Sequence, residues 1–329
     1  MSIRFEGVFP VLPTPLREDQ SPDLDGICSL AEHCLKKNVH GLVCLGSGGE
    51  FPYFSIEEKR EIVKAIMSVA KDRIPVIVGN GCMSAQETIA FSEHAAKCGA
   101  AGFLMAVPTY YPVGFKDVLS HFTMVSKAVP TPILYYHYPE NTRLKLSPVE
   151  IVRICEIATV VGIKETTLNL REVRRHILLA GRKPFSVLSG TSFLFLEIMK
   201  MGGKGVICPL PLVIPETVVG MYERFMKGDL KGAEDLERKI FKALPLFSEI
   251  PLPPGIARHA LKLLARLGFP LGASGIAIQA TFKEALSQMG LKISPLVRTP
   301  LEQIDERRKK VIEKVLKELY CISIDSKLT

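Results

Sequence analysis

Residues 75–107, PVIVGNGCMSAQETIAFSEHAAKCGAAGFLMAV, contain the repeating unit that decides the fold. The stretch opens with an apolar run, Pro75–Gly79, and returns to a second one, Gly102–Val107. Between the two runs lies Thr88–Cys98, a segment with helical periodicity. Because this segment is long enough to cross back over a sheet, the two runs predict neighbouring parallel strands joined by a helix.

Similar apolar runs recur at near-regular intervals along the chain. The eight runs are Gly7–Leu12, Gly41–Leu45, Pro75–Gly79, Gly102–Val107, Pro132–Tyr136, Val160–Lys164, Phe185–Ser189 and Gly205–Cys208. They are almost wholly apolar instead of alternating, which is typical of strands covered on both faces. No GxGxxG follows the first run, so a doubly wound dinucleotide-binding sheet loses its main support. The sequence therefore predicts an α/β fold, a TIM (β/α)8 barrel.

Helix signals agree with this phasing. Ser55 with Glu58 and Ser147 with Glu150 form capping boxes, which mark two helix starts between predicted strands. Helical segments continue after the eighth run, over Pro215–Lys227, Leu230–Phe247, Ile256–Leu267, Ser274–Gly290 and Glu306–Lys317. We expect residues 1–228 to form the barrel and residues 229–329 to form a helical C-terminal extension packed on it.

Composition excludes several classes of protein. The 329 residues are 47% hydrophobic and 23% charged, which is typical of a globular chain. The net charge is +8, but cations and anions are interleaved, as in Glu57–Glu61, so we expect no nucleic-acid partner. No apolar stretch is long enough to span a bilayer and the first ten residues do not resemble a signal peptide, so we expect no membrane association and a cytoplasmic location.

The eight cysteines form no CxxC pair and no metal-ligand spacing, which indicates reduced packing residues.

Chemistry in such barrels collects at the carboxyl ends of the strands. The sixth run ends in Lys164, where burial would lower the pKa of the ammonium toward neutrality and expose the amine that an imine requires. The alternatives are a lysine that extends to the rim of the barrel or one that pairs with Glu165.

Two further strand ends carry polar groups. After the second run, Ser47 and its neighbouring glycines offer backbone amides and a hydroxyl suited to a carboxylate, although a tight turn would use the same residues. Tyr110 and Tyr136 follow the fourth run and end the fifth, where either phenol could serve in proton transfer or in packing.

Together these residues resemble the dihydrodipicolinate synthase / N-acetylneuraminate lyase family of class I aldolases. The motifs stand in the family's order and spacing over nearly the whole predicted barrel. They are Phe9-Pro10 with Thr14-Pro15, Gly46–Glu50, Pro75–Gly79, Tyr136 three before Pro139, Gly162–Glu165, Ser189-Gly190, and Gly202-Gly203 before Gly205–Ile207.

The resemblance implies a lyase with named catalytic residues. Lys164 would form a Schiff base with pyruvate or a related 2-oxo acid, and Tyr136 would shuttle protons. Ser47 would link Tyr136 to Tyr110, which would reach in from a neighbouring subunit of a homotetramer built as a dimer of dimers. The residues implied to bind substrate are Gly48, Gly49, Gly190, Ile207 and Arg143. The resemblance implies no metal and no organic cofactor.

Departures from the family pattern bear on the second substrate. The synthase branch has paired threonines where this chain has Ser47-Gly48, and an arginine where it has Asn141, so Arg143 is the nearest cation. The sialic acid lyase branch has acidic residues after the glycine that matches Gly190, whereas Thr191 stands here. Both departures argue against those activities.

Other fragments are similar to the 4-hydroxy-2-oxoglutarate aldolase branch. They are Gly46–Pro52, Gly81-Cys82 followed by Gln86, and Asn141-Thr142. We therefore favour a short 2-oxo acid aldolase. Dihydrodipicolinate synthase, a 2-keto-3-deoxy sugar acid aldolase, and a 2-oxo acid sensor or scaffold that has lost turnover remain alternatives.

Overall fold

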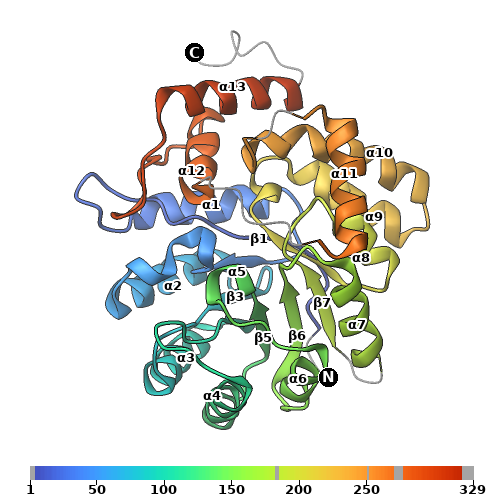
Figure 1. The fold of residues 1–329 in the computed structure, drawn as a ribbon. Helices are drawn as coiled ribbons and strands as arrows, with labels where there is room; N and C mark the ends of the chain where they lie inside the picture. The colour runs from blue at the N-terminus through green and yellow to red at the C-terminus, as the bar shows by residue number, and fades with distance from the viewer. Residues whose placement is uncertain (1–3, 182–184, 250–251, 270–276, 321–329) are drawn as a thin grey trace.

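The computed structural model describes residues 4–181, 185–249, 252–269 and 277–320, and it has the predicted barrel (Figure 1). Eight parallel strands are ordered β1-β8-β7-β6-β5-β4-β3-β2. Their bounds are β1 Gly7–Pro10, β2 Leu42–Cys44, β3 Val76–Gly79, β4 Gly102–Met105, β5 Ile133–His137, β6 Val160–Glu165, β7 Ser186–Ser189 and β8 Gly205–Cys208. A parallel bridge between Val11 and Val43 joins the two ends of the sheet, where the Leu12 amide donates to the Val43 carbonyl at 2.8 Å. The sheet is therefore closed.

Helices follow the strands and surround the barrel. They are α1 Leu24–Leu35, α2 Ile56–Ala70, α3 Ala85–Cys98, α4 Phe115–Ala128, α5 Pro139–Thr142, α6 Pro148–Cys155, α7 Leu170–Ala180, α8 Phe195–Lys200 and α9 Pro215–Met226. Both predicted capping boxes are present, at Ser55 for α2 and at Ser147 for α6. These caps satisfy amides of the first helical turn that have no partner within the helix.

The apolar strands have two buried faces, as expected. Phe9, Ile77 and Leu134 belong to a cluster that fills the barrel, whereas Val8 and Val76 pack outward with the helices. Alternating residues of one strand thus enter different cores, which explains why the runs lack a polar face.

The C-terminal helices gather on one side of the barrel, away from α3, α4 and α6 (Figure 1). They are α10 Leu230–Ile240, α11 Pro254–Leu267, α12 Ile278–Gln288 and α13 Glu306–Tyr320. Ile312, Val315 and Leu316 bury one face of α13, and a helix is confirmed where the sequence predicts one. No helix in the described part of the chain is long and apolar enough to cross a membrane.

The largest differences from the predicted helix bounds occur in the C-terminal part of the chain. The segment Leu230–Phe247 is not one α-helix, because α10 ends at Ile240 and a 3₁₀ helix, η4, covers Phe241–Leu246. Pro245 lies in η4 and has no amide hydrogen to donate, so an α-helix cannot continue undisturbed through it. Of the segment Ser274–Gly290, α12 covers Ile278–Gln288, and residues 274–276 lie outside the described residues.

The described cysteines carry no disulfide. These residues are buried or half-buried: Cys28, Cys34, Cys44, Cys82, Cys98, Cys155 and Cys208. Their burial confirms the prediction that they are packing residues, and Cys321 lies outside the described residues.

Candidate active site

Lys164 lies near the carboxyl end of β6 with its side chain inside the barrel. In the sheet register it pairs with Tyr136 of β5, and Gly162 pairs with Leu134, whose side chain belongs to the interior cluster. Lys164 is only 5% exposed, and its Nζ lies 4.1 Å from the centre of the Tyr136 ring. Burial lowers the pKa of Lys164 to about 7, so a large fraction of the amine is neutral near that pH.

The neighbouring carboxylate does not pair with this lysine. Consecutive strand residues point to opposite faces, and Glu165 points outward, with its carboxylate 2.9 Å from Nδ1 of His176 on α7. The amide of Thr167 also donates to Glu165, at 2.9 Å. Pairing of Lys164 with Glu165 and extension of Lys164 to the rim are thus both wrong for this chain.

Tyr136 connects the lysine to the loop after β2. Its hydroxyl oxygen lies 3.3 Å from Oγ of Ser47, as the predicted relay requires. Burial raises the pKa of Tyr136 to about 12, and the contact with Ser47 opposes this shift. The phenol is therefore protonated at neutral pH and able to donate.

A second phenol lies at this site, and the sequence motifs assign it no role. The ring of Tyr138 stacks on that of Tyr136, with centroids 5.5 Å apart and an interplanar angle of 28°. Burial raises the pKa of Tyr138 to about 12. The sequence spacing could have indicated that Tyr138 lies at the site, because residues two positions apart in a strand point to the same face.

The loop after β2 forms a short 3₁₀ helix, η1, over Ser47–Gly49. The Gly49 amide donates to the Gly46 carbonyl at 2.9 Å, and the Glu50 amide donates to the Ser47 carbonyl at 3.2 Å. Of the four amides from Ser47 to Glu50, those of Ser47 and Gly48 have no acceptor among the described residues. A Cβ on Gly49 would lie 2.9 Å from the Leu12 carbonyl oxygen, so this glycine permits the close approach of two backbones.

Gly190 lies at a close approach of two backbone segments, whereas Ile207 lies in the apolar interior of the barrel. The Gly190 amide donates to the Glu165 carbonyl at 2.7 Å, and a Cβ there would lie 2.3 Å from Thr166, so this glycine also serves a close approach. Ile207 is fully buried in the interior cluster that includes Tyr136.

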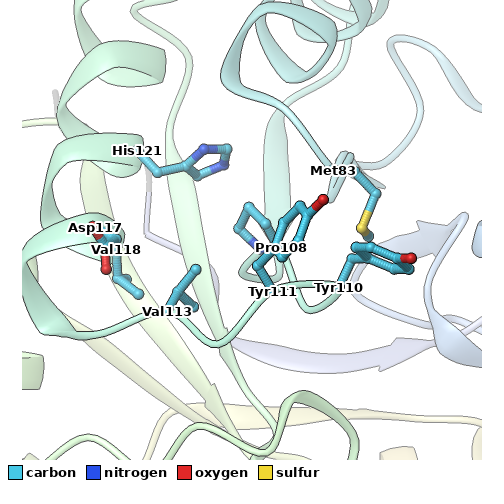
Figure 2. Close-up of a pocket in the computed structure, with 8 residues that line it drawn as sticks. All are labelled: Met83, Pro108, Tyr110, Tyr111, Val113, Asp117, Val118 and His121. Carbon is cyan, nitrogen blue, oxygen red and sulfur yellow. The ribbon is translucent and has the colours of Figure 1, made fainter.

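Tyr110 and Arg143 lie on the surface of the single chain. Tyr110 is 80% exposed and packs edge-on against Tyr111, which is 73% exposed. Both line a pocket of about 340 Å³ together with Met83 (Figure 2). Arg143 is exposed at the end of α5, where its φ of 53° places it in the left-handed region. The chain alone thus brings together Lys164, Tyr136 and Ser47, but neither Tyr110 nor Arg143 joins them.

Among the described residues, no three His, Cys, Asp or Glu side chains are arranged to hold a metal ion. The hydroxyls of Tyr136 and Ser47, together with the backbone amides of the loop after β2, suit an organic carbonyl compound with a carboxylate.

Comparison with known proteins agrees with this geometry. Residues 4–269 match the Dihydrodipicolinate synthetase family. The 4-hydroxy-tetrahydrodipicolinate synthase of Archaeoglobus fulgidus is 31% identical over 97% of this chain and 100% of the relative. The synthase of Methanospirillum hungatei is 32% identical over 86% of this chain and 99% of the relative.

Solved structures are similar over the same length. YagE, a prophage protein of the dihydrodipicolinic acid synthase family from E. coli K12 in complex with pyruvate, has a TM-score of 0.84 and 26% identity, covering 97% of this chain and 99% of that one. Dihydrodipicolinate synthase from Thermotoga maritima has a TM-score of 0.83 and 27% identity, covering 97% of this chain and 100% of that one. These relatives do not single out the 4-hydroxy-2-oxoglutarate aldolase branch. They do confirm the predicted family: the chain is a lyase of the class I aldolase type and belongs to the dihydrodipicolinate synthetase family.

Proposed function

We propose that this enzyme forms a Schiff base between Lys164 and pyruvate or a related short 2-oxo acid, and then makes or breaks a carbon–carbon bond next to the imine. The observation that carries the proposal is the buried Lys164 amine beside Tyr136, whose hydroxyl contacts Ser47. The complex of YagE with pyruvate supports the choice of 2-oxo acid.

The site residues support each step of imine formation. The neutral amine of Lys164 attacks the keto carbon and gives a carbinolamine. Tyr136 donates its phenolic proton to the departing hydroxyl, which leaves as water, and a protonated imine remains. Loss of a proton from the adjacent carbon then gives an enamine, the nucleophile that adds to an aldehyde. Ser47 lies where it can pass protons to and from the Tyr136 phenolate.

The loop after β2 is the proposed carboxylate site. The amides of Ser47 and Gly48 have no acceptor among the described residues and could donate to a carboxylate, whereas that of Gly49 is used within the turn. Gly49 and Gly190 would therefore shape the site by permitting close backbone approaches, and Ile207 would supply an apolar wall. Two amide donors would fix the keto carbon beside Lys164, which converts proximity into rate.

Tyr110 enters this proposal through a second copy of the chain. Exposed Tyr110, Tyr111 and Met83 lie together around one pocket, and such exposed apolar patches mark interaction sites. A partner subunit that buries Tyr110 would let it extend the relay from Ser47. We propose a homo-oligomer, built as a tetramer of two dimers, in a cytoplasmic location. Light scattering checks the oligomer, and an active monomer would contradict the role of Tyr110.

The acceptor is proposed to be a short aldehyde that carries a carboxylate, as in a 4-hydroxy-2-oxoglutarate aldol. Arg143 is exposed at the end of α5, so its side chain would have to move toward Lys164 to bind that second carboxylate. The second candidate is 4-hydroxy-tetrahydrodipicolinate synthase, which the archaeal relatives favour by name.

Borohydride reduction with and without pyruvate tests the proposal. We expect a pyruvate-dependent mass adduct on the peptide that carries Lys164 and none in a Lys164→Ala control. Cleavage of 4-hydroxy-2-oxoglutarate and condensation of pyruvate with aspartate semialdehyde then distinguish the two acceptors. A folded protein that forms no adduct would exclude the Schiff-base function and favour a sensor or scaffold.

A further inference from the structure

The proposed carboxylate site is held in place by the C-terminal extension. Glu50, directly after η1, has its carboxylate 2.5 Å from Nζ of Lys283 on α12, and both side chains are fully buried. The backbone amide of Arg298 donates to the other carboxylate oxygen of Glu50, at 2.7 Å. Glu50 has φ 59° and ψ 28°, a left-handed conformation that costs energy in a residue with a side chain. Its buried partners offset that cost.

A second contact from the same helix reaches the loop itself. Nε2 of Gln279 donates to the carbonyl of Ser47 at 3.1 Å. Gln279 and Lys283 are one helical turn apart and share one face of α12, which is directed at the loop. Lys283 is fixed in turn by the carbonyl of Leu296, which accepts from its Nζ at 2.6 Å.

These contacts act on the groups that would bind substrate. The carbonyl of Ser47 accepts both from Gln279 and from the Glu50 amide, so its peptide plane is fixed from outside the barrel and from within the turn. The peptide after Ser47 joins this carbonyl to the amide of Gly48, for which the described part of the chain supplies no acceptor. A rotation of that plane would therefore move a proposed carboxylate donor together with the carbonyl.

We propose that Gln279 and Lys283 are positioning residues for the 2-oxo acid carboxylate: Gln279 orients the Ser47–Gly48 peptide, and Lys283 holds Glu50 at the end of the loop. This inference rests on the proposed function, because it assigns a purpose to the loop only if a carboxylate binds there. It makes the helical extension part of the active-site framework.

The test measures how much pyruvate is needed to trap Lys164. Borohydride trapping over a series of pyruvate concentrations gives a half-saturating concentration for the wild type, for Gln279→Met, and for the double variant Glu50→Gln/Lys283→Met. Methionine keeps the length of glutamine but cannot donate, and the double variant removes both buried charges together so that neither is left unpaired. We expect the half-saturating concentration to rise about three- to tenfold in Gln279→Met, as the loss of one hydrogen bond predicts, with full trapping at saturation.

A matched control lies in the same extension. Nζ of Lys262 on α11 lies 2.6 Å from buried Glu237 and 3.1 Å from Glu197, away from the loop. Lys262→Met should lower the thermal midpoint without changing the half-saturating concentration. If Lys262→Met raises that concentration as much as Gln279→Met does, or if Gln279→Met behaves as the wild type, the inference is wrong.

Two other outcomes stay distinguishable. If the double variant does not fold, Gln279→Met decides alone, since Gln279 is only half-buried and its substitution leaves no charge unpaired. If the wild type itself gives no adduct, that result contradicts the proposed function, and the inference that rests on it is wrong as well.

Discussion

Lys164 and Glu165 are neighbours in β6, yet their side chains lie on opposite faces of the barrel wall. The amine points inward to the Tyr136 ring, and the carboxylate points outward to His176. The strand therefore separates two charges that could otherwise neutralise each other at close range. This separation leaves burial as the main influence on the pKa of Lys164, which falls to about 7.

The rate of imine formation should follow the neutral form of Lys164. We expect the initial rate of trapping with pyruvate and cyanoborohydride to rise with pH through about 7 and to level off above 8. At pH 6 the rate should be roughly a tenth of the plateau, because about a tenth of the amine is neutral one unit below its pKa. A midpoint near 10 would contradict the burial of this amine.

The same burial should cost stability. The pKa of Lys164 is lower in the folded chain than the ordinary value of 10.5, so the folded state binds fewer protons between about pH 7 and pH 10.5. The penalty is fully present below pH 7, is on the order of 3 to 5 kcal/mol there, and fades as the pH rises from about 7 to about 10.5. Lys164→Met should therefore raise the thermal midpoint by several degrees at pH 7.

The gain from Lys164→Met should shrink between pH 8 and pH 10, which scanning calorimetry over that range can follow. A gain that is independent of pH would point to better packing instead of a relieved charge. Lys145→Met is a suitable control, because Lys145 is largely exposed and its contact with Glu172 should contribute little.

Two glycines should respond in opposite ways to alanine. A Cβ on Gly79 would lie 1.9 Å from the carbonyl oxygen of Leu45, so Gly79→Ala must displace the backbone between β2 and β3. We expect a loss of roughly 1 to 3 kcal/mol or more. Gly255, in the first turn of α11, has open space where a Cβ would lie, with nothing within 4 Å, and Gly255→Ala should raise stability by about 0.5 kcal/mol. Equal effects in urea unfolding would contradict this difference in local space.

The barrel could be predicted because its signals are local. Each apolar run, such as Val76–Gly79, and each capping box, such as Ser55 with Glu58, can be recognised within a few residues. The meeting of Lys164, Tyr136 and Ser47 could also be predicted, because all three stand at carboxyl ends of strands that converge in this fold.

The supports of the site could not be predicted in the same way. Gln279 and Lys283 reach the loop after β2 from more than 230 residues away in the sequence, and nothing in their surroundings indicates that contact. The sequence also could not show that the Gly49 and Gly190 amides are used within the chain, because hydrogen-bond partners depend on the tertiary approach of backbones. Tyr138 was visible in the sequence, but its stacking on Tyr136 follows from the path of the chain after β5.

The two stacked tyrosines allow the proton-transfer role to be tested with a matched pair. Tyr136→Phe keeps the ring beside Lys164 and on Tyr138 but removes the hydroxyl that contacts Ser47, so the fold should persist while turnover falls by about 10² to 10⁴. Tyr138→Phe keeps the same stack and removes a hydroxyl that has no place in the proposed relay, so turnover should fall less than tenfold. Steady-state rates of aldol cleavage, with thermal midpoints to confirm folding, give the comparison. Equal losses in the two variants would show that the stack, and not the Tyr136 proton, sets the rate.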